Sequence, residues 1–288
     1  MIITSTLQPL RESVAEWQSR GESIAFVPTM GNLHAGHLNL VQRAQDIADH
    51  VVVSIFINPL QFGPNEDFAE YPRTFEADCV NLAVEEIDLL FVPSEENLFP
   101  LGREHQTRIN VPGLSDILCG EVRPGFFSGV ATIVAKLFNI VTPDVAIFGQ
   151  KDYQQWLVVN RMIADLNLPI QCIMAPTMRE KDGLAMSSRN QYLSEEERAL
   201  APLLYSSLQV CADIFRAEGY QPEAIAQISN ELSRQGLKID YFTGRHQIDL
   251  SEPQHGTPAD DLVILGAVRL GSTRLIDNIL ISHLPSSN

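Results

Sequence analysis

The sequence has few basic residues and little cysteine, and it contains no long apolar run. Lysine and arginine number 20 against 36 aspartates and glutamates, which gives a formal net charge of −16. Because polyanions repel such a chain, we expect neither nucleic acid nor an anionic membrane as its main partner. Any phosphate site must then be made positive locally, by placed cations, a helix N-terminus or a metal ion.

The four cysteines (Cys79, Cys119, Cys172 and Cys211) include no C-x-x-C pair. This spacing argues against a zinc or redox site and predicts reduced, structural thiols. No basic segment followed by an apolar block opens the chain, and no apolar run approaches the roughly 20 residues of a membrane span. We therefore expect a cytoplasmic protein with no membrane contact.

The chain does have ample material for a core, with 288 residues of which 45% are hydrophobic. Apolar segments alternate with amphipathic ones over the first part of the chain. Strands are predicted at 24–28, 51–57, 88–92, 145–148 and 170–175, and helices at 36–50, 72–87, 127–141 and 153–166. This alternation predicts an α/β fold with a doubly wound, Rossmann-like parallel sheet.

The pattern changes after residue 175. Ser194 and Glu197 form a capping box that opens a helix, Pro202 predicts a kink or early break in it, and Pro222 marks another helix start. Strands are predicted at 238–243, 262–268 and 273–281. Helices followed by strands indicate a second, smaller α+β domain, so we predict domains at 1–175 and 176–288.

Polar groups gather where predicted strands end, at the edge where an open parallel sheet binds ligands. His34 and His37 lie three positions apart at a strand-to-helix junction, and so share one helix face. With the helix N-terminus, and with Gly36 allowing close approach, they would cradle a phosphate without a Gly-rich loop. The alternative is two unrelated helix histidines, one capping and one on the surface.

Two further segments suit a nucleotide. Lys151 follows a predicted strand, and its ammonium can reach phosphate oxygens, while Asp152 can bind ribose hydroxyls or orient Lys151. Ser187, Ser188 and Arg189 lie on a polar loop that could clamp phosphate and close over it. The structural alternative for Lys151 and Asp152 is a solvated pair at a loop tip, and the alternative for Ser187, Ser188 and Arg189 is an ordinary Ser-rich linker.

Neutral amides at Asn58, Gln61 and Gln155 suit a small polar organic acid, because amides both donate and accept hydrogen bonds. Asn58 precedes a proline, so we expect it to serve partly as a turn former. The alternative for Gln155 is an ordinary surface glutamine.

In this order, the segments resemble the pantothenate synthetase (pantoate–β-alanine ligase) family, in the nucleotidyltransferase superfamily with H-x-G-H signatures. The resemblance runs from Thr29 to Ser194. It rests on P-T-M-G-x-L-H-x-G-H, F-x-N-P-x-Q-F, Y-P-R-T, R-P-G, K-L-F-N-I-V, F-G-x-K-D-x-Q-Q and R-E-x-D-G-L-A-x-S-S-R-N. The chain departs from the family at Phe126, where His is usual, and at Leu60, where Thr is usual.

The resemblance implies an ATP-dependent ligase that joins (R)-pantoate to β-alanine through a pantoyl adenylate, releasing AMP and pyrophosphate. It implies catalytic roles for His34, His37, Lys151 and Arg189, with His37 as a candidate proton donor. The implied ATP site comprises Met30, Gly31, Asn32, Leu33, His34, Ala35, Gly36, His37, Gly149, Gln150, Lys151, Asp152, Met178, Met186, Ser187, Ser188 and Arg189.

Gln61, Gln155 and Asn58 would hold pantoate and β-alanine. Mg²⁺ is expected to bridge the phosphates without direct side-chain ligands, and a homodimer is expected from the family. Residues 1–175 would bind the nucleotide and pantoate, and residues 176–288 would form a lid.

Two other functions stay open at this point. Another H-x-G-H nucleotidyltransferase is disfavoured by Gln61 and Gln155, because a phosphorylated substrate would call for more cations. A non-catalytic nucleotide sensor is disfavoured by the set of intact candidate catalytic residues, His34, His37, Lys151 and Arg189. A soluble α/β domain with coincidental motifs is the remaining alternative.

Overall fold

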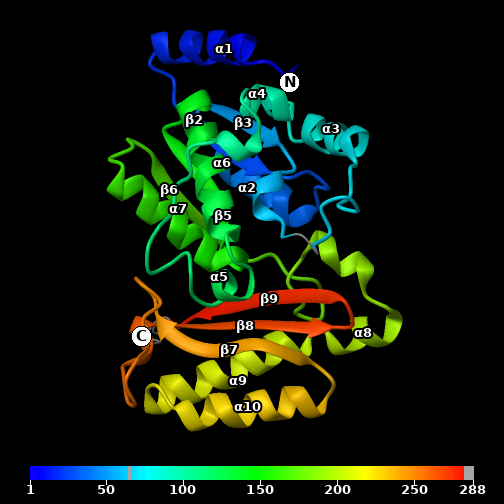
Figure 1. Cartoon of the computed structure of the whole chain (residues 1–288), viewed down its shortest axis with the longest axis vertical. Coiled ribbons are helices and arrows are strands. Elements are labelled where there is room, and N and C mark those ends of the chain that lie inside the picture. The colour runs from blue at the N-terminus through cyan, green and yellow to red at the C-terminus, as the bar shows by residue number, and fades with distance from the viewer. Residues whose placement is uncertain (64–65, 282–288) are drawn as a thin grey trace. The chain divides into compact units, whose positions relative to one another are not determined.

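The computed structural model describes residues 1–63 and 66–281. The chain divides into two compact units, which we call the first unit (residues 1–150 and 154–176) and the second unit (residues 151–153 and 177–288). Figure 1 shows their helices and strands with the labels used below.

Within the described residues, the first unit contains a six-stranded sheet in the order β1-β4-β3-β2-β5-β6, and every pairing is parallel. Its strands are β1 (Ile2–Thr4), β2 (Ile24–Thr29), β3 (His50–Ile55), β4 (Leu89–Phe91), β5 (Val145–Gly149) and β6 (Gln171–Ala175). Its principal helices are α1 (Leu7–Ser19), α2 (Ala35–Gln45), α3 (Phe75–Val84), α6 (Phe126–Val141) and α7 (Tyr153–Asp165). Shorter pieces are η1 (Pro59–Gln61), α4 (Glu95–Leu98), η2 (Arg103–His105) and α5 (Cys119–Val122). The chain passes between the units within η3 (Gln150–Asp152), whose last two residues belong to the second unit, as does the first residue of α7. The predicted doubly wound sheet is confirmed, although the sequence pattern missed β1 and α1.

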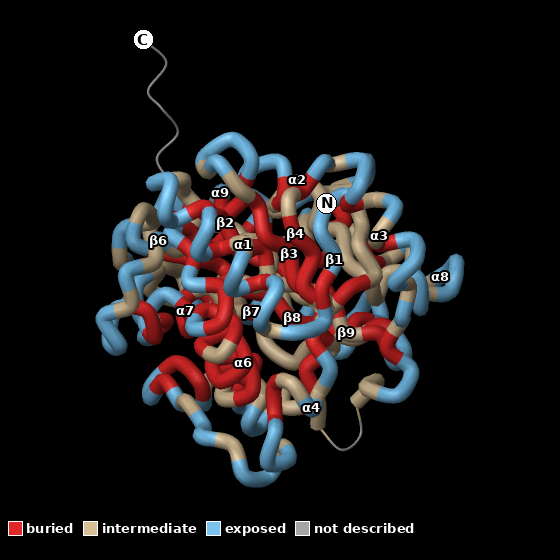
Figure 2. Tube along the Cα trace, turned by 90° about the horizontal axis from the view of Figure 1, so that it is seen from above, coloured by how far each residue is buried: buried red, intermediate tan, exposed pale blue. Residues whose placement is uncertain are grey.

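Helices cover both faces of this sheet. Successive side chains of a strand point to opposite faces, so apolar strands present an apolar surface on each side that a helix must cover. Ala25 and Val27 of β2 share one core cluster with Val41 of α2. Phe26, between them in sequence, points the other way and meets Phe138 of α6 edge to face, with ring centroids 6.3 Å apart. Both faces are therefore sealed from water, and Figure 2 shows the central strands and α6 in the buried colour.

The second unit is α+β, as predicted. Within the described residues, β7 (Lys238–His246), β8 (Leu262–Leu270) and β9 (Thr273–Leu280) form an antiparallel sheet in that order. The helices α9 (Leu203–Glu218) and α10 (Pro222–Arg234) run beside these strands (Figure 1), and Leu208, Phe215 and Leu232 belong to one core cluster with the sheet. The remaining elements are η4 (Ser188–Tyr192), α8 (Glu195–Leu200) and η5 (Ala259–Asp261).

The predicted starts and breaks of helices in the second unit are confirmed. Ser194 and Glu197 form the predicted capping box of α8. The helix ends at Leu200, and α9 begins beyond Pro202. Pro222 is the first residue of α10, where its missing N–H leaves no intrahelical bond unmade.

Two predicted helices were too long. The helix predicted at 36–50 ends at Gln45, because His50 already pairs with Ile24 as the first residue of β3. Ala48 therefore lies beyond the helix. The helix predicted at 72–87 covers only Phe75–Val84, since Thr74 is its N-cap and Glu86 takes a positive φ of 55° that ends the helical path.

Candidate active site

The sheet order puts a switch point between β2 and β5. These strands are neighbours, paired at Ala25 with Val145, while β3 and β4 continue to one side of them and β6 to the other. Ligands of open α/β sheets bind outside the carboxyl ends of the strands at such a point. The predicted site segments at 30–37 and 149–150 follow the carboxyl ends of these two strands.

A buried carboxylate holds the turn that follows β2. Gly31 and Asn32 have φ values of 80° and 50°. Asp78 of α3, only 2% exposed, accepts hydrogen bonds from the backbone N–H groups of Asn32 at 2.9 Å and Leu33 at 2.8 Å. A Cβ on Gly31 would lie 3.1 Å from the Asp78 carboxylate. Asp78 was not among the predicted site residues, because its only local signal is an acidic residue four positions after the Y-P-R-T motif.

His34 and His37 come together at the N-terminus of α2. The His34 Nδ1 accepts from the Gly36 N–H at 3.1 Å, and the His37 Nδ1 accepts from the His34 N–H at 3.4 Å, which completes a capping box. The ring centroids are 4.1 Å apart. Because both Nδ1 atoms act as acceptors, the neutral rings carry their hydrogens on Nε2. Each ring is thus set to donate from Nε2, beside the partial positive charge of the helix end.

The capping alternative is half right. His34 is the N-cap of α2, as a structural histidine would be. His37, however, is partly buried, and its ring lies against that of His34 at an angle of 35° instead of on the open surface.

Gln61 is held by side chains on both sides. Asn58, 1% exposed, donates from Nδ2 to the Gln61 Oε1 at 2.9 Å and to the Gly129 carbonyl at 3.1 Å. The Gln61 Nε2 lies 2.9 Å from the Met30 Sδ, which ties the amide to the turn after β2. Asn58 also caps η1 by accepting from the Leu60 N–H, so it is the turn former that the sequence predicts.

The segment carrying Gln61 lies tightly against α6. A Cβ on Gly129 would sit 2.1 Å from the Leu60 carbonyl oxygen, a distance that no side chain tolerates. Glycine at this position therefore decides how closely η1 approaches the helix.

Phe126, which departs from the family pattern, stacks on an arginine. The Arg123 Cζ lies 3.8 Å from the Phe126 ring centroid, a cation–π contact. Arg123 donates from Nε to Glu66 at 2.6 Å and from Nη2 to the Gln61 carbonyl at 3.1 Å. Phe126 thus acts on the Gln61 segment through this guanidinium, a connection that the sequence alone did not reveal.

In the second unit, Lys151 is fixed by its main chain. Its carbonyl accepts from the Asn278 Nδ2 at 3.0 Å. Its Nζ lies 3.8 Å from the Asp152 carboxylate, an ion pair too long for a hydrogen bond. Tyr153 donates from its hydroxyl to the Gln247 carbonyl at 2.8 Å, and burial raises the pKa of this phenol to about 12, so it keeps its proton.

Residues 178–186 form a hairpin with an antiparallel bridge between Arg179 and Ala185, and η4 follows it. The Met186 N–H donates to the Met178 carbonyl at 3.0 Å. The Ser187 hydroxyl accepts from the Arg189 N–H at 3.3 Å, which makes this serine the cap of η4. Asn190 ties the hairpin together by donating to Glu180 at 3.0 Å and to the Ala185 carbonyl at 3.1 Å.

The predicted site residues divide between the two units. The first unit contains Met30, Gly31, Asn32, Leu33, His34, Ala35, Gly36, His37, Asn58, Gln61, Gly149, Gln150 and Gln155. The second unit contains Lys151, Asp152, Met178, Met186, Ser187, Ser188 and Arg189. That both sets serve one ligand is part of the proposal below.

The four cysteines, all within the described part of the chain, are thiols and form no disulfide; Cys119 and Cys211 are buried. Burial raises the pKa of Cys172 and of Cys211 to about 12, so neither is a reactive thiolate at neutral pH. Across residues 1–63 and 66–281, no group of three or more His, Cys, Asp and Glu side chains is arranged to hold a metal ion. No helix among these same residues has the length and hydropathy to span a bilayer.

Comparison with known proteins identifies the relatives of the chain. The sequence profile of the pantoate-beta-alanine ligase family matches residues 2–280. The chain belongs to this family. It is 51% identical to the pantothenate synthetase of Pseudomonas aeruginosa over 286 residues, covering 99% of this chain and 100% of that relative.

Solved structures of this ligase family have the same fold. A pantothenate synthetase from Thermus thermophilus superposes with a TM-score of 0.91 at 44% identity, covering 98% of this chain and 100% of that one. A pantoate-beta-alanine ligase from Francisella tularensis, described as complexed with beta-gamma ATP and beta-alanine, superposes with a TM-score of 0.80 at 33% identity, covering 99% and 100%.

Proposed function

We propose that this ligase joins (R)-pantoate to β-alanine in two steps. The pantoate carboxylate attacks the α-phosphorus of ATP, forming pantoyl adenylate and releasing pyrophosphate. The β-alanine amine then attacks the acyl carbon, and AMP leaves with the bonding electrons as pantothenate forms. Adenylation is needed because a free carboxylate is a very poor acyl donor.

The placement of the H-x-G-H turn carries the proposal. The turn lies at the switch point of the sheet, and both Nδ1 atoms of its histidines are used by the backbone, which sets Nε2 as the donor of each ring. Donors fixed before the reaction stabilise charge that develops on a phosphoryl group, since they need no reorganisation. We assign His34 and His37 to the phosphates of ATP as hydrogen-bond donors from Nε2. His37 would also donate a proton if its ring is protonated on binding ATP, which requires Nδ1 to give up its contact with the His34 N–H.

The cations of the second unit suit the rest of the triphosphate. Lys151, Ser187, Ser188 and Arg189 would neutralise the phosphates and the leaving pyrophosphate. Mg²⁺ would supply further neutralisation of the triphosphate charge; it keeps several waters when bound and so needs few protein ligands. Asp152 is the carboxylate among the assigned residues, and its side chain, 44% exposed, leaves an oxygen accessible to the ribose hydroxyls.

The amides of the first unit suit pantoate. Gln61 and Gln155 would hold its hydroxyl and carboxylate groups, with Gln61 also near β-alanine, and Asn58 would keep the Gln61 amide in place. We further propose a cytoplasmic homodimer in which residues 176–288 act as a lid.

A coupled assay tests this function. We expect AMP formation to require both pantoate and β-alanine, and pyrophosphate to appear with pantoate alone. We expect His37→Ala to slow pyrophosphate release by roughly 10²–10⁴-fold, the usual contribution of a positioned proton-transfer group. The control is His105→Ala, at an exposed histidine of the same unit, which should keep the wild-type rate.

Other results of these assays would contradict the proposal or favour a different function. Near-normal pyrophosphate release by His37→Ala would remove His37 from the mechanism. ATP binding without turnover would favour a nucleotide sensor. Nucleotide transfer to a phosphorylated acceptor in place of pantoate would favour another nucleotidyltransferase.

A further inference from the structure

Strand β9 carries two adjacent buried polar residues that serve different partners. Asp277 and Asn278 are 4% and 2% exposed. Neighbouring side chains of a strand point to opposite faces, so each residue acts on a different part of the unit. Asn278 donates from Nδ2 to the Lys151 carbonyl at 3.0 Å, across 127 positions of sequence.

Asp277 binds the guanidinium of Arg179 through both carboxylate oxygens, with Nη2 to Oδ1 at 3.0 Å. The same Asp277 oxygen accepts from the Asn278 N–H at 2.8 Å. Arg179 also donates to the Gly183 carbonyl at 3.1 Å, and its Cζ lies 3.5 Å from the Tyr205 ring centroid. The guanidinium is therefore fixed by a bidentate carboxylate, a backbone carbonyl and the face of an aromatic ring.

Arg179 lies in the hairpin that leads to the proposed phosphate-binding loop. Its backbone bridges to Ala185, directly before Met186 and Ser187. Asn190, just beyond Arg189, is tied back to Ala185 at 3.1 Å. A continuous chain of contacts thus runs from Lys151 through Asn278, Asp277 and the hairpin to the loop.

We propose that Asp277 and Asn278 are positioning residues for the groups that bind the ATP phosphates. Asn278 holds the main chain of Lys151, and Asp277, through Arg179, holds the segment with Ser187 and Arg189. The inference rests on the proposed function, because it takes these groups to be the phosphate ligands.

A role in stability alone fits this pair poorly. Burial raises the pKa of Asp277, and the opposing effect of Arg179 does not cancel it. A buried ion pair is often no more stabilising than apolar side chains of similar volume, although removing one partner destabilises the fold, so stability alone does not explain why the Asp277–Arg179 pair is present. What the Asp277–Arg179 pair does supply is geometry, because its two parallel hydrogen bonds fix the start of the hairpin that leads to Ser187 and Arg189.

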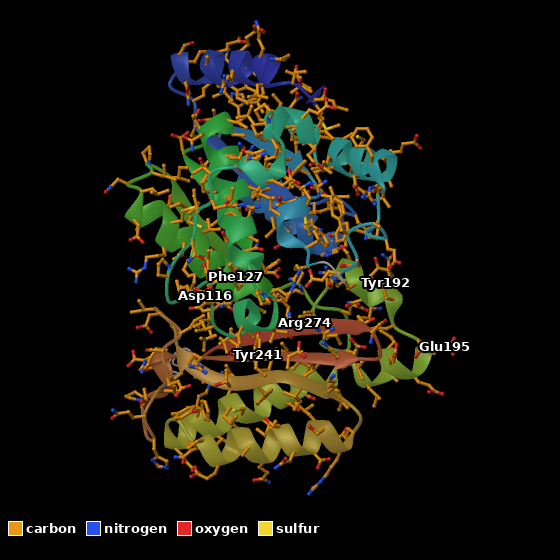
Figure 3. The ribbon with its side chains drawn as sticks, in the orientation of Figure 1. Asp116, Phe127, Tyr192, Glu195, Tyr241 and Arg274 are labelled. Carbon is orange, nitrogen blue, oxygen red and sulfur yellow. The ribbon has the colours of Figure 1, made fainter. Side chains whose placement is uncertain are left out.

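The same sheet offers a matched control. Asp240 of β7, with 9% of its side chain exposed, pairs with Arg269 at 3.2 Å and with Arg274 at 2.7 Å. Figure 3 labels Arg274 on β9 and Tyr241 beside Asp240 in sequence. This ion pair links strands of the sheet to one another, as a purely structural pair does.

The experiment compares Asn278→Ala, Asp277→Asn and Asp240→Asn for kcat, for KM of each substrate, for ATP affinity by calorimetry and for Tm. For Asn278→Ala we expect kcat/KM for ATP to fall by about 3- to 10-fold, which corresponds to one lost hydrogen bond. For Asp277→Asn we expect a larger fall, and in both variants KM for pantoate should stay near wild type. Asp240→Asn should lower Tm while keeping wild-type kinetics.

The inference is overturned if Asn278→Ala and Asp277→Asn lower Tm but keep wild-type kcat, KM and ATP affinity, as is expected of Asp240→Asn. Should Asp277→Asn fail to fold, Arg179→Lys tests the same link, because it keeps the charge and loses the fork; wild-type ATP kinetics in it would also overturn the inference. Wild-type protein that releases no pyrophosphate with pantoate would instead refute the proposed function, whatever the variants do.

Discussion

The replacement Asp78→Asn tests how the histidine turn is held. In the wild type, the carboxylate accepts two backbone N–H groups and the Thr74 hydroxyl, the last at 3.2 Å. An asparagine of the same shape has one acceptor oxygen, and its NH₂ group would face an N–H donor. At least one of the carboxylate's hydrogen bonds to the turn is therefore lost, and the amide NH₂ group is placed against a backbone N–H donor.

The expected magnitude follows from these contacts. A hydrogen bond to a charged group contributes about 1.5–3 kcal/mol, so we expect a loss of about that size. For a unit of the size of the first one, each kcal/mol lowers Tm by roughly 2–4 °C, so the expected shift is about 3–12 °C. Because His34 follows the turn directly, a displacement of about 1 Å would slow adenylation by roughly 10²-fold.

Pyrophosphate release and thermal unfolding should be measured on Asp78→Asn and on Asp144→Asn. Asp144 accepts from the Ile24 N–H at 2.8 Å, so it also caps a backbone group of β2, but at the amino end of the strand. We expect Asp144→Asn to lose a little stability and no activity. If Asp78→Asn keeps the wild-type Tm and rate, the carboxylate does not hold the turn and the reasoning is wrong.

Three further predictions concern other parts of the first unit. Phe126→Ala removes the ring that stacks on Arg123, whose guanidinium contacts the Gln61 carbonyl. The variant should raise KM for pantoate several-fold more than KM for ATP. Equal KM values in wild type and variant would show that Phe126 has no role in binding pantoate. Gln155→Ala should weaken pantoate more than ATP in steady-state kinetics, and equal losses would contradict the pocket assignment. Burial lowers the pKa of His50, but hydrogen bonds to Glu22 at 2.8 Å and Asp88 at 3.0 Å outweigh it and raise this pKa above the ordinary value of 6.5. The stabilisation that the protonated His50 ring gains from these two carboxylates is therefore complete below pH 6.5 and is lost as pH rises through the raised pKa. In chemical denaturation, His50→Gln should have its largest loss of unfolding free energy, relative to wild type, at acidic pH. A difference that does not change with pH would refute the ion pairs.

Much of the fold could be read from local pattern. Alternating strands and helices predicted the parallel sheet, and Ser194, Pro202 and Pro222 predicted where helices begin and break, because capping and proline geometry act within a few residues. The helix after β2 was predicted too long, since its end depends on His50 pairing with Ile24 in the sheet. The strand β1 and helix α1 carried too weak a pattern to be predicted.

The sequence by itself determined the family, the sheet and the identity of the groups proposed for the chemistry, because these depend on residue types at short spacing. Only the tertiary structure decided what holds those groups. Asp78 reaches Asn32 across 46 positions, Arg123 reaches Gln61 across 62, and Asn278 reaches Lys151 across 127. Such hydrogen bonds have no local signature, because they form only after folding brings a buried donor and a buried acceptor together in space.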